Sequence, residues 1–264
     1  MVRNREQILY IVGAVLLVAV LYFGFDTIPT KQKELEKSRV LSGAEFDIHT
    51  LQADAKKLLE PNDIALVESI ESQVQFAKDD STRIEPLKQL SGFWFSHQKP
   101  ILAGSYAKQV AEITQDAQSW SITGTTFAAA LSQTDLEAKM KEDVRDQAVA
   151  AFENAISLEP NVVEHRVNQA LCYIETPDVA QPMKGIQMLA STATNYPESA
   201  LPPYHLARLA VRTGQMERAE ERIEQALKID STNSKIACLA IEIYTTVNKP
   251  AEAKALEGRC TGTK

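Results

Sequence analysis

Apolar and polar residues follow a helical period along most of the chain after residue 45. The pattern is clearest over residues 206–230, where apolar and alanine positions return every three or four residues on both sides of Thr213 and Gly214. Charged residues fill the positions between them, so this stretch predicts two amphipathic helices joined by a short turn. Residues 50–59 and 63–79 carry the same period and predict further helices upstream.

The N-terminus has a different pattern, because the 18 residues from Ile8 to Phe25 include no charged side chain. At about 1.5 Å per residue, a helix of this length crosses most of a hydrocarbon core roughly 30 Å thick. The sequence therefore predicts a transmembrane helix, with Tyr10 and Tyr22 near the lipid headgroups. A cleaved signal peptide and a buried core helix are the alternatives. A signal peptide would have a shorter apolar region followed by a small-x-small cleavage site.

Basic residues lie on both sides of this span, so their count does not decide its orientation. A short basic tail before a first span usually stays in the cytoplasm. We therefore expect a single-pass protein of a bacterial inner membrane whose C-terminal domain lies in the periplasm. The three cysteines, an odd number, fit an oxidising compartment poorly. Cys172 and Cys238 fall within predicted helices, and we interpret them as small core residues rather than a disulfide or redox pair.

Small and apolar positions recur at regular intervals after residue 140. Three sets, separated by 37 and then 34 residues, are Ala148, Phe152, Ala155 and Pro160; Gly185, Leu189, Thr192 and Pro197; and Ala219, Ile223, Ala226 and Ser231. This spacing indicates a structural repeat, in which each helix pair buries its apolar face only against its neighbours.

These sets resemble the tetratricopeptide repeat, whose unit of about 34 residues is a pair of antiparallel helices with small residues at the close contacts. Residues 200–233 match it best, with Ala207 in place and Ser231 where proline is usual. Residues 87–113, which include Trp94, look like a degenerate unit. The resemblance implies an all-α fold in which an N-terminal transmembrane helix precedes a right-handed α-solenoid with a concave groove.

This interpretation divides the chain into six parts. They are a cytoplasmic tail at 1–7, the transmembrane helix at 8–25, a stalk or linker at 26–44, capping helices at 45–83, the solenoid at 84–257 and a C-terminal tail at 258–264. The unit that begins near Trp120 is expected to have an insertion at 131–142, because its second helix is expected to start only around Asp143. The next unit carries three extra residues in the turn near Pro177.

Charge and composition argue against several function classes. The chain has 28 basic and 35 acidic residues and a formal net charge of -7, so it offers no electrostatic footprint for nucleic acid. Its four histidines are far apart and belong to no metal or nucleophile motif. Folding could bring His165 and His205 together, but surface or groove histidines are the simpler interpretation. We therefore predict no enzyme, and no catalytic residue, metal, cofactor or small-molecule substrate.

In the family that these repeats resemble, the first helix of each unit lines the concave face. That register selects Val167, Asn168 and Leu171 from one unit, Tyr204, His205, Arg208 and Arg212 from the next, and Lys235 and Glu242 from the last. We expect the binding set to be Asn168, Leu171, Tyr204, His205, Arg208 and Arg212. The two arginines lie four residues apart on one helical face, where they could hold an acidic or C-terminal carboxylate of a peptide. Alternatively, they could simply pair with nearby carboxylates such as Glu217.

The resemblance implies a membrane-anchored scaffold for protein–protein interactions, with proteins or peptides of a membrane complex as partners. Its layout is similar to the single-span ancillary subunit of the Sec translocon, which suggests an ancillary or chaperone-like role at a translocation or secretion complex. The clamp with which some family members bind chaperone tails is not reproduced, since Ile122, Thr126 and Leu201 stand at three of its sites. Two alternatives stay open. One is an assembly factor of a membrane complex, for instance in cytochrome maturation, and the other is a structural protein that self-associates through its last helix near residues 251–256.

Overall fold

The computed structural model describes residues 48–134 and 136–260. The predicted cytoplasmic tail, transmembrane helix and linker fall outside these residues and stay predictions. Everything described below belongs to the compact unit of residues 46–264. Among the described residues, none of the helices has the length and the hydropathy that a membrane span requires.

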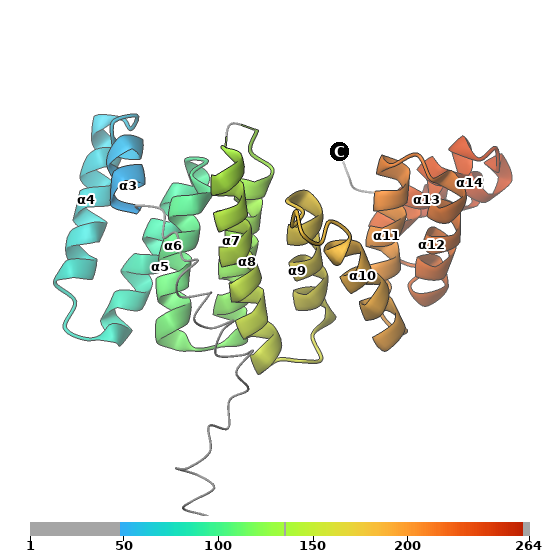
Figure 1. Ribbon diagram of the computed structural model, residues 1–264. Coiled ribbons are helices and arrows are strands. Elements are labelled where there is room, and N and C mark those ends of the chain that lie inside the picture. The colour runs from blue at the N-terminus through green and yellow to red at the C-terminus, as the bar shows by residue number, and fades with distance from the viewer. Residues whose placement is uncertain (1–47, 135, 261–264) are drawn as a thin grey trace, which may run out of the picture. The chain divides into compact units, whose positions relative to one another are not determined.

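All regular structure in the described residues is helical, apart from one isolated bridge between Asp178 and Gln181 (Figure 1). In chain order the elements are α3 (Ile48–Lys56), α4 (Pro61–Gln75), α5 (Asp80–Ser96), α6 (Pro100–Thr114), α7 (Ala117–Leu131), α8 (Ala138–Leu158), α9 (Val163–Glu175), α10 (Lys184–Asn195), α11 (Leu201–Arg212), α12 (Met216–Ile229), α13 (Ser234–Thr246), α14 (Pro250–Leu256) and a 3-10 turn (Glu257–Arg259).

Consecutive helices from α5 onward form hairpins, and each hairpin stacks on the next. α5 pairs with α6, α7 with α8, α9 with α10, α11 with α12 and α13 with α14, and the second helix of each hairpin packs on the first helix of the following one. Figure 1 shows this succession of helix pairs. The described residues thus form an all-α stacked repeat of tetratricopeptide-like hairpins. The right-handed twist of the array stays a prediction.

The recurring positions of the sequence fill the contacts within and between hairpins. Phe152, Leu189 and Ile223, the bulky members, have no exposed surface. The small members are buried around them: Ala148, Ala155, Gly185, Thr192, Ala219 and Ala226. Because a fully buried side chain as large as these bulky ones contributes about 1.5–3 kcal/mol, the repeat spacing marks the positions that hold neighbouring helices together.

Glycines set the distance between neighbouring helices at several contacts. A methyl group at Gly185 of α10 would lie 2.6 Å from the carbonyl oxygen of Ala170 on α9, so any side chain there would push the two helices apart. A methyl group at Gly124 of α7 would lie 2.8 Å from the ring of Phe152 on α8. In close-packed interiors such contacts leave no room even for one carbon atom.

The prediction of an insertion at 131–142 is wrong for its second half. α8 begins at Ala138 rather than around Asp143 and runs for 21 residues. Lys139 pairs with Asp143 one turn later at 2.7 Å, and Met140 packs on the core shared by α7, α8 and α9. The extra residues therefore mainly lengthen a helix, because they carry both a salt bridge at helical spacing and an apolar contact to the core.

The interpretation of the cysteines is right for one residue and wrong for another. Cys172 is buried in α9, and burial raises the pKa of its thiol to about 12. Cys238, only half-buried on α13, is instead joined to Cys260 by a disulfide, with 4.8 Å between the Cα atoms. α14 runs back along α13, and the turn Glu257–Arg259 then packs on α13. This reversal joins cysteines 22 residues apart, and helical periodicity alone cannot reveal it.

The apolar face of α14 is covered by its own hairpin partner. Ala253 and Leu256 are buried in a core cluster with residues of α13, including Ile236 and Tyr244. No large apolar side chain of α14 is exposed. Of its apolar side chains, the last helix therefore exposes only small ones, such as Ala251 and Ala255, which gives little support to self-association through this helix.

Candidate binding groove

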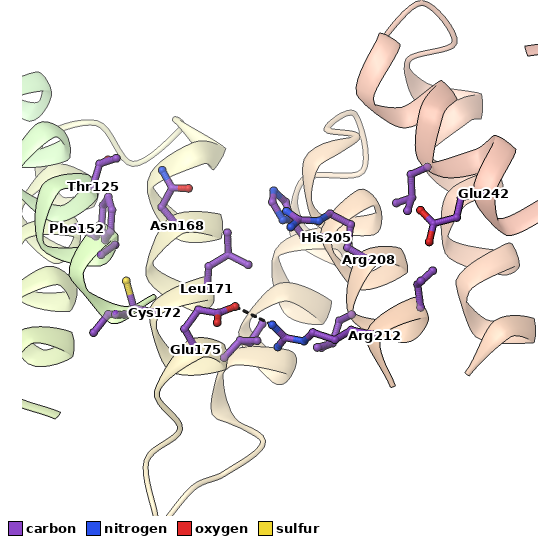
Figure 2. Close-up of a pocket in the computed structure, with 16 residues that line it drawn as sticks. Thr125, Phe152, Asn168, Leu171, Cys172, Glu175, His205, Arg208, Arg212 and Glu242 are labelled. Carbon is purple, nitrogen blue, oxygen red and sulfur yellow. Dashed lines mark hydrogen bonds and ion pairs between the residues drawn. The ribbon is translucent and has the colours of Figure 1, made fainter. Parts of the chain in front are cut away.

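The first helices of successive hairpins, α7, α9, α11 and α13, line one groove with a volume of about 440 Å³. Figure 2 shows that its wall includes five of the six predicted binding residues: Asn168, Leu171, His205, Arg208 and Arg212. Tyr204 does not line the groove, but its ring packs edge-on against His205 with 5.1 Å between ring centroids. Folding therefore brings together most of the set that the repeat register selects.

The three remaining candidates of the register lie in different surroundings. Glu242 of α13 lines the groove. Lys235 is exposed at the start of α13, outside the groove wall. Val167 is only 1% exposed and packs inside the α9–α10 hairpin, so it serves the core and not the groove.

The floor of the groove is apolar, and the sequence analysis missed most of it. Half-buried side chains from three helices form this floor: Leu171, Ile174, Leu209, Val211 and Leu239. Ile174 follows Leu171 by three residues and Leu209 follows His205 by four, so both share a helical face with a predicted residue. A search that extended each predicted position by one turn would have found them.

The two arginines of α11 differ in their partners. Arg212 donates from Nη1 to Oε1 of Glu175 on α9 at 2.9 Å, the dashed contact in Figure 2. Both side chains are about half exposed, and such a pair contributes only about 0–1 kcal/mol. Arg208 is exposed, pairs with no carboxylate among the described residues, and places its guanidinium 6.0 Å from the centre of the Tyr204 ring. The alternative prediction, that the arginines pair with nearby carboxylates, is therefore confirmed for Arg212 only. Its partner is Glu175 and not Glu217.

His205 is a neutral group at the edge of the groove. Burial, and then the positive charges of Arg208 and Lys235, lower the pKa of its imidazole to about 4. At pH 7 the ring therefore carries no charge and can both donate and accept a hydrogen bond. Beside the apolar floor, the groove thus presents one uncharged imidazole, the exposed guanidinium of Arg208, the amide of Asn168 and the exposed carboxylate of Glu242.

His165 does not join His205. It is buried at the start of α9, where its Nε2 lies 3.6 Å from Oε2 of Glu159, and it is not part of the groove wall. In residues 48–134 and 136–260, no group of three or more histidine, cysteine or acidic side chains is placed to hold a metal ion. The two histidines that the sequence analysis compared therefore occupy separate sites.

No protein-family model matches the chain, and no curated protein matches it. Among solved structures, residues 41 to the end of MamA from Desulfovibrio magneticus RS-1 are 16% identical, with 67% of this chain and 92% of that chain covered and a TM-score of 0.41. Two further crystal structures of MamA are 12% and 13% identical, cover 67% and 65% of this chain and 89% and 92% of theirs, and also have TM-scores of 0.41. Scores this low carry no inference about function. The hairpins themselves define the class, an all-helical protein with tetratricopeptide-like repeats.

Proposed function

We propose that this chain is a membrane-anchored protein-interaction scaffold that binds a segment of a partner protein in the groove lined by α7, α9, α11 and α13. One observation carries the proposal: side chains from consecutive repeats converge on a single groove of about 440 Å³ with an apolar floor and a polar edge. In sites of this kind, burial of apolar surface supplies affinity, and a few polar groups fix the orientation of the ligand.

The floor and the edge have separate tasks in this proposal. Leu171, Leu209 and Leu239 are half-buried, and an apolar side chain of the partner would cover their remaining surface at about 25 cal/mol per Å². Arg208 offers charged donors without an intramolecular carboxylate partner among the described residues, and His205 offers a neutral donor or acceptor. Together they would fix a polar or acidic group of the partner at the edge.

The membrane anchor and the periplasmic location are parts of the same proposal. The uncharged stretch from Ile8 to Phe25 supports the anchor. The disulfide between Cys238 and Cys260 supports an oxidising compartment, because such bonds form and persist outside the reducing cytosol. A role at a translocation or secretion complex, or in the assembly of another membrane complex, stays a prediction from the sequence layout.

Photocrosslinking in living cells tests the groove as the partner site. A photoreactive amino acid replaces Thr125 of α7 or Glu242 of α13, two exposed positions of the groove wall, in the full-length protein at native expression. We expect both positions to capture the same partner, identified by mass spectrometry.

Matched control positions lie on second helices outside the groove, at Asn154 of α8 and Glu221 of α12, which are also exposed. These controls should capture little. Capture from the control positions alone, or none from the groove positions, would show that the groove is not the partner site.

A further inference from the structure

A second groove, with a volume of about 600 Å³, lies along the α9–α10 hairpin. Its wall includes Arg166 and Gln169 of α9 and Lys184, Gln187 and Asn195 of α10. It shares no lining residue with the first groove. The same hairpin therefore presents two separate concave surfaces.

Two cations of this second groove are held on tyrosine rings. Lys184 donates from Nζ to the hydroxyl of Tyr173 at 2.7 Å and lies 3.9 Å from the ring centroid. Arg166 donates from Nε to the hydroxyl of Tyr196 at 3.1 Å, with its guanidinium 5.7 Å from that ring centroid. Arg166 and Tyr173 are seven residues apart on α9, roughly 10 Å of helix, so the two cations lie at opposite ends of the groove.

Neither cation has an acidic counter-ion among residues 48–134 and 136–260. Arg166 and Lys184 take part in none of the ion pairs among the described residues. No carboxylate in the described part of the chain lines the groove either, although the full sequence has 35 acidic residues and a net charge of -7. The tyrosine rings orient the two cations but leave their full charge available, so the groove attracts anionic groups.

The carboxamide of a glutamine on α9 also lines the groove. Gln169 follows Arg166 by three residues on α9, is only 8% exposed, and makes no hydrogen bond with any described residue. Its amide is accessible from the groove, where it can bond to water or to a ligand. Gln187 and Asn195 on α10 add two further carboxamides, and each carboxamide offers both a donor and an acceptor, as a peptide backbone does.

We propose that this second groove binds an acidic, extended polypeptide segment. One carboxylate of the segment pairs with Lys184 and another with Arg166, while its backbone bonds to the carboxamides of Gln169, Gln187 and Asn195. Nucleic acid fits less well, because two cations neutralise few phosphates and the chain as a whole is negative. The proposal goes beyond the function proposed above, since it gives the α9–α10 hairpin a second ligand on a different surface.

Fluorescence anisotropy tests the proposal with the full-length protein in a mild nonionic detergent. The probe is a fluorescein-labelled peptide of alternating glutamate and alanine, whose extended backbone spaces carboxylates on one face by about 7 Å. We expect saturable binding. The double variant Arg166→Gln with Lys184→Gln should weaken it about tenfold or more, because two charge-assisted hydrogen bonds are lost.

Two further variants control for the loss of net charge and for the loss of folding. Arg218→Gln with Arg222→Gln removes the same charge from α12, the corresponding helix of the next hairpin, and should leave the affinity unchanged. Arg166 also donates to the carbonyl oxygen of Pro160 at 3.2 Å, so its replacement could loosen the hairpin. Gln187→Glu keeps both cations, adds a repelling charge inside the groove, and should weaken binding severalfold.

Several results would overturn the proposal. Equal affinity for a glutamine–alanine peptide would show that charge does not drive binding. An equal loss in the α12 variant would show that only net charge matters. Binding of a single-stranded oligonucleotide but not of the peptide would show that the ligand is a nucleic acid and not an acidic polypeptide. Loss of peptide binding on Arg208→Gln alone would place the peptide in the first groove.

Discussion

The two halves of the described residues build the same hairpin from different side chains. In the first half, α5 to α8, aromatic rings pack against glycines, as Phe127 does against Gly104. In the second half, α9 to α14, aliphatic side chains pack among alanines, as Ile223 does with Ala219 and Ala226. The distance between two helices depends on the combined size of the facing side chains. A large ring opposite a glycine and two side chains of middle size are therefore two ways to fill the space between helices.

The largest expected effect comes from truncating the bulky residue in each half. Phe152→Ala removes a fully buried ring that packs on Gly124 and should destabilise the protein by about 3–5 kcal/mol. Ile223→Ala, at the corresponding position of the second half, removes fewer atoms and should cost less, within about 2–5 kcal/mol. Equilibrium unfolding in urea measures both free energies. A larger cost for Ile223→Ala would contradict the comparison.

Loss of the disulfide should act on the second half alone. Replacing Cys238 and Cys260 by serine opens a loop with a sequence separation of 22, which in the chain-entropy model costs about 3 kcal/mol. Amide hydrogen exchange should accelerate in α13 and α14 and stay unchanged in α5 and α6, because each hairpin contacts only its neighbours. A reductant added to the unaltered protein should reproduce the effect. Uniform acceleration along the whole chain would show that the two halves unfold as one unit.

A single methyl group distinguishes glycines that set helix spacing from those that do not. Gly185→Ala should destabilise by about 1–3 kcal/mol, because its methyl group would lie 2.6 Å from a backbone carbonyl oxygen that cannot turn aside. Gly92→Ala in α5 meets nothing within 4 Å and should stabilise by about 0.5–1 kcal/mol through helix propensity. Thermal unfolding followed by circular dichroism compares them. If both variants shift the melting temperature in the same direction, the close contact at Gly185 does not limit packing.

The last expected effect is a pH dependence confined to the second half. The folded pKa of His205 is about 4, below its value of about 6.5 in an unfolded chain. Between about pH 6.5 and pH 4 the imidazole of His205 is protonated in the unfolded state but neutral in the folded state. Its contribution to the free energy of unfolding is therefore fully present above about pH 6.5 and is lost as the pH falls toward 4. Urea unfolding at pH 7 and pH 5 should show a smaller loss for His205→Gln than for the unaltered protein. An NMR titration that places the imidazole pKa of His205 near 6.5 would contradict this.

The helices and their pairing follow largely from residue spacing. From α8 onward, the recurring small and bulky positions predict the buried residues directly, because each needs only the contacts of its own hairpin and the next. The buried residues of the first half are harder to predict from the sequence. Phe127 packs against Gly104, but neither residue belongs to the three recurring sets. The register likewise places five of the six expected residues in the first groove, but it omits Ile174 and Leu209, which lie one turn further along the same faces.

The sequence by itself determined which positions face a neighbouring helix, because a period of 3.6 residues places them on one side whatever the helix packs against. Only the tertiary structure decided the bond between Cys238 and Cys260, the pair between Arg212 and Glu175, and the charge pattern of the second groove. These contacts join residues of different segments of the chain. Their distances depend on how closely the helices pack, which is set by the volumes of many side chains together and not by the period of any one segment.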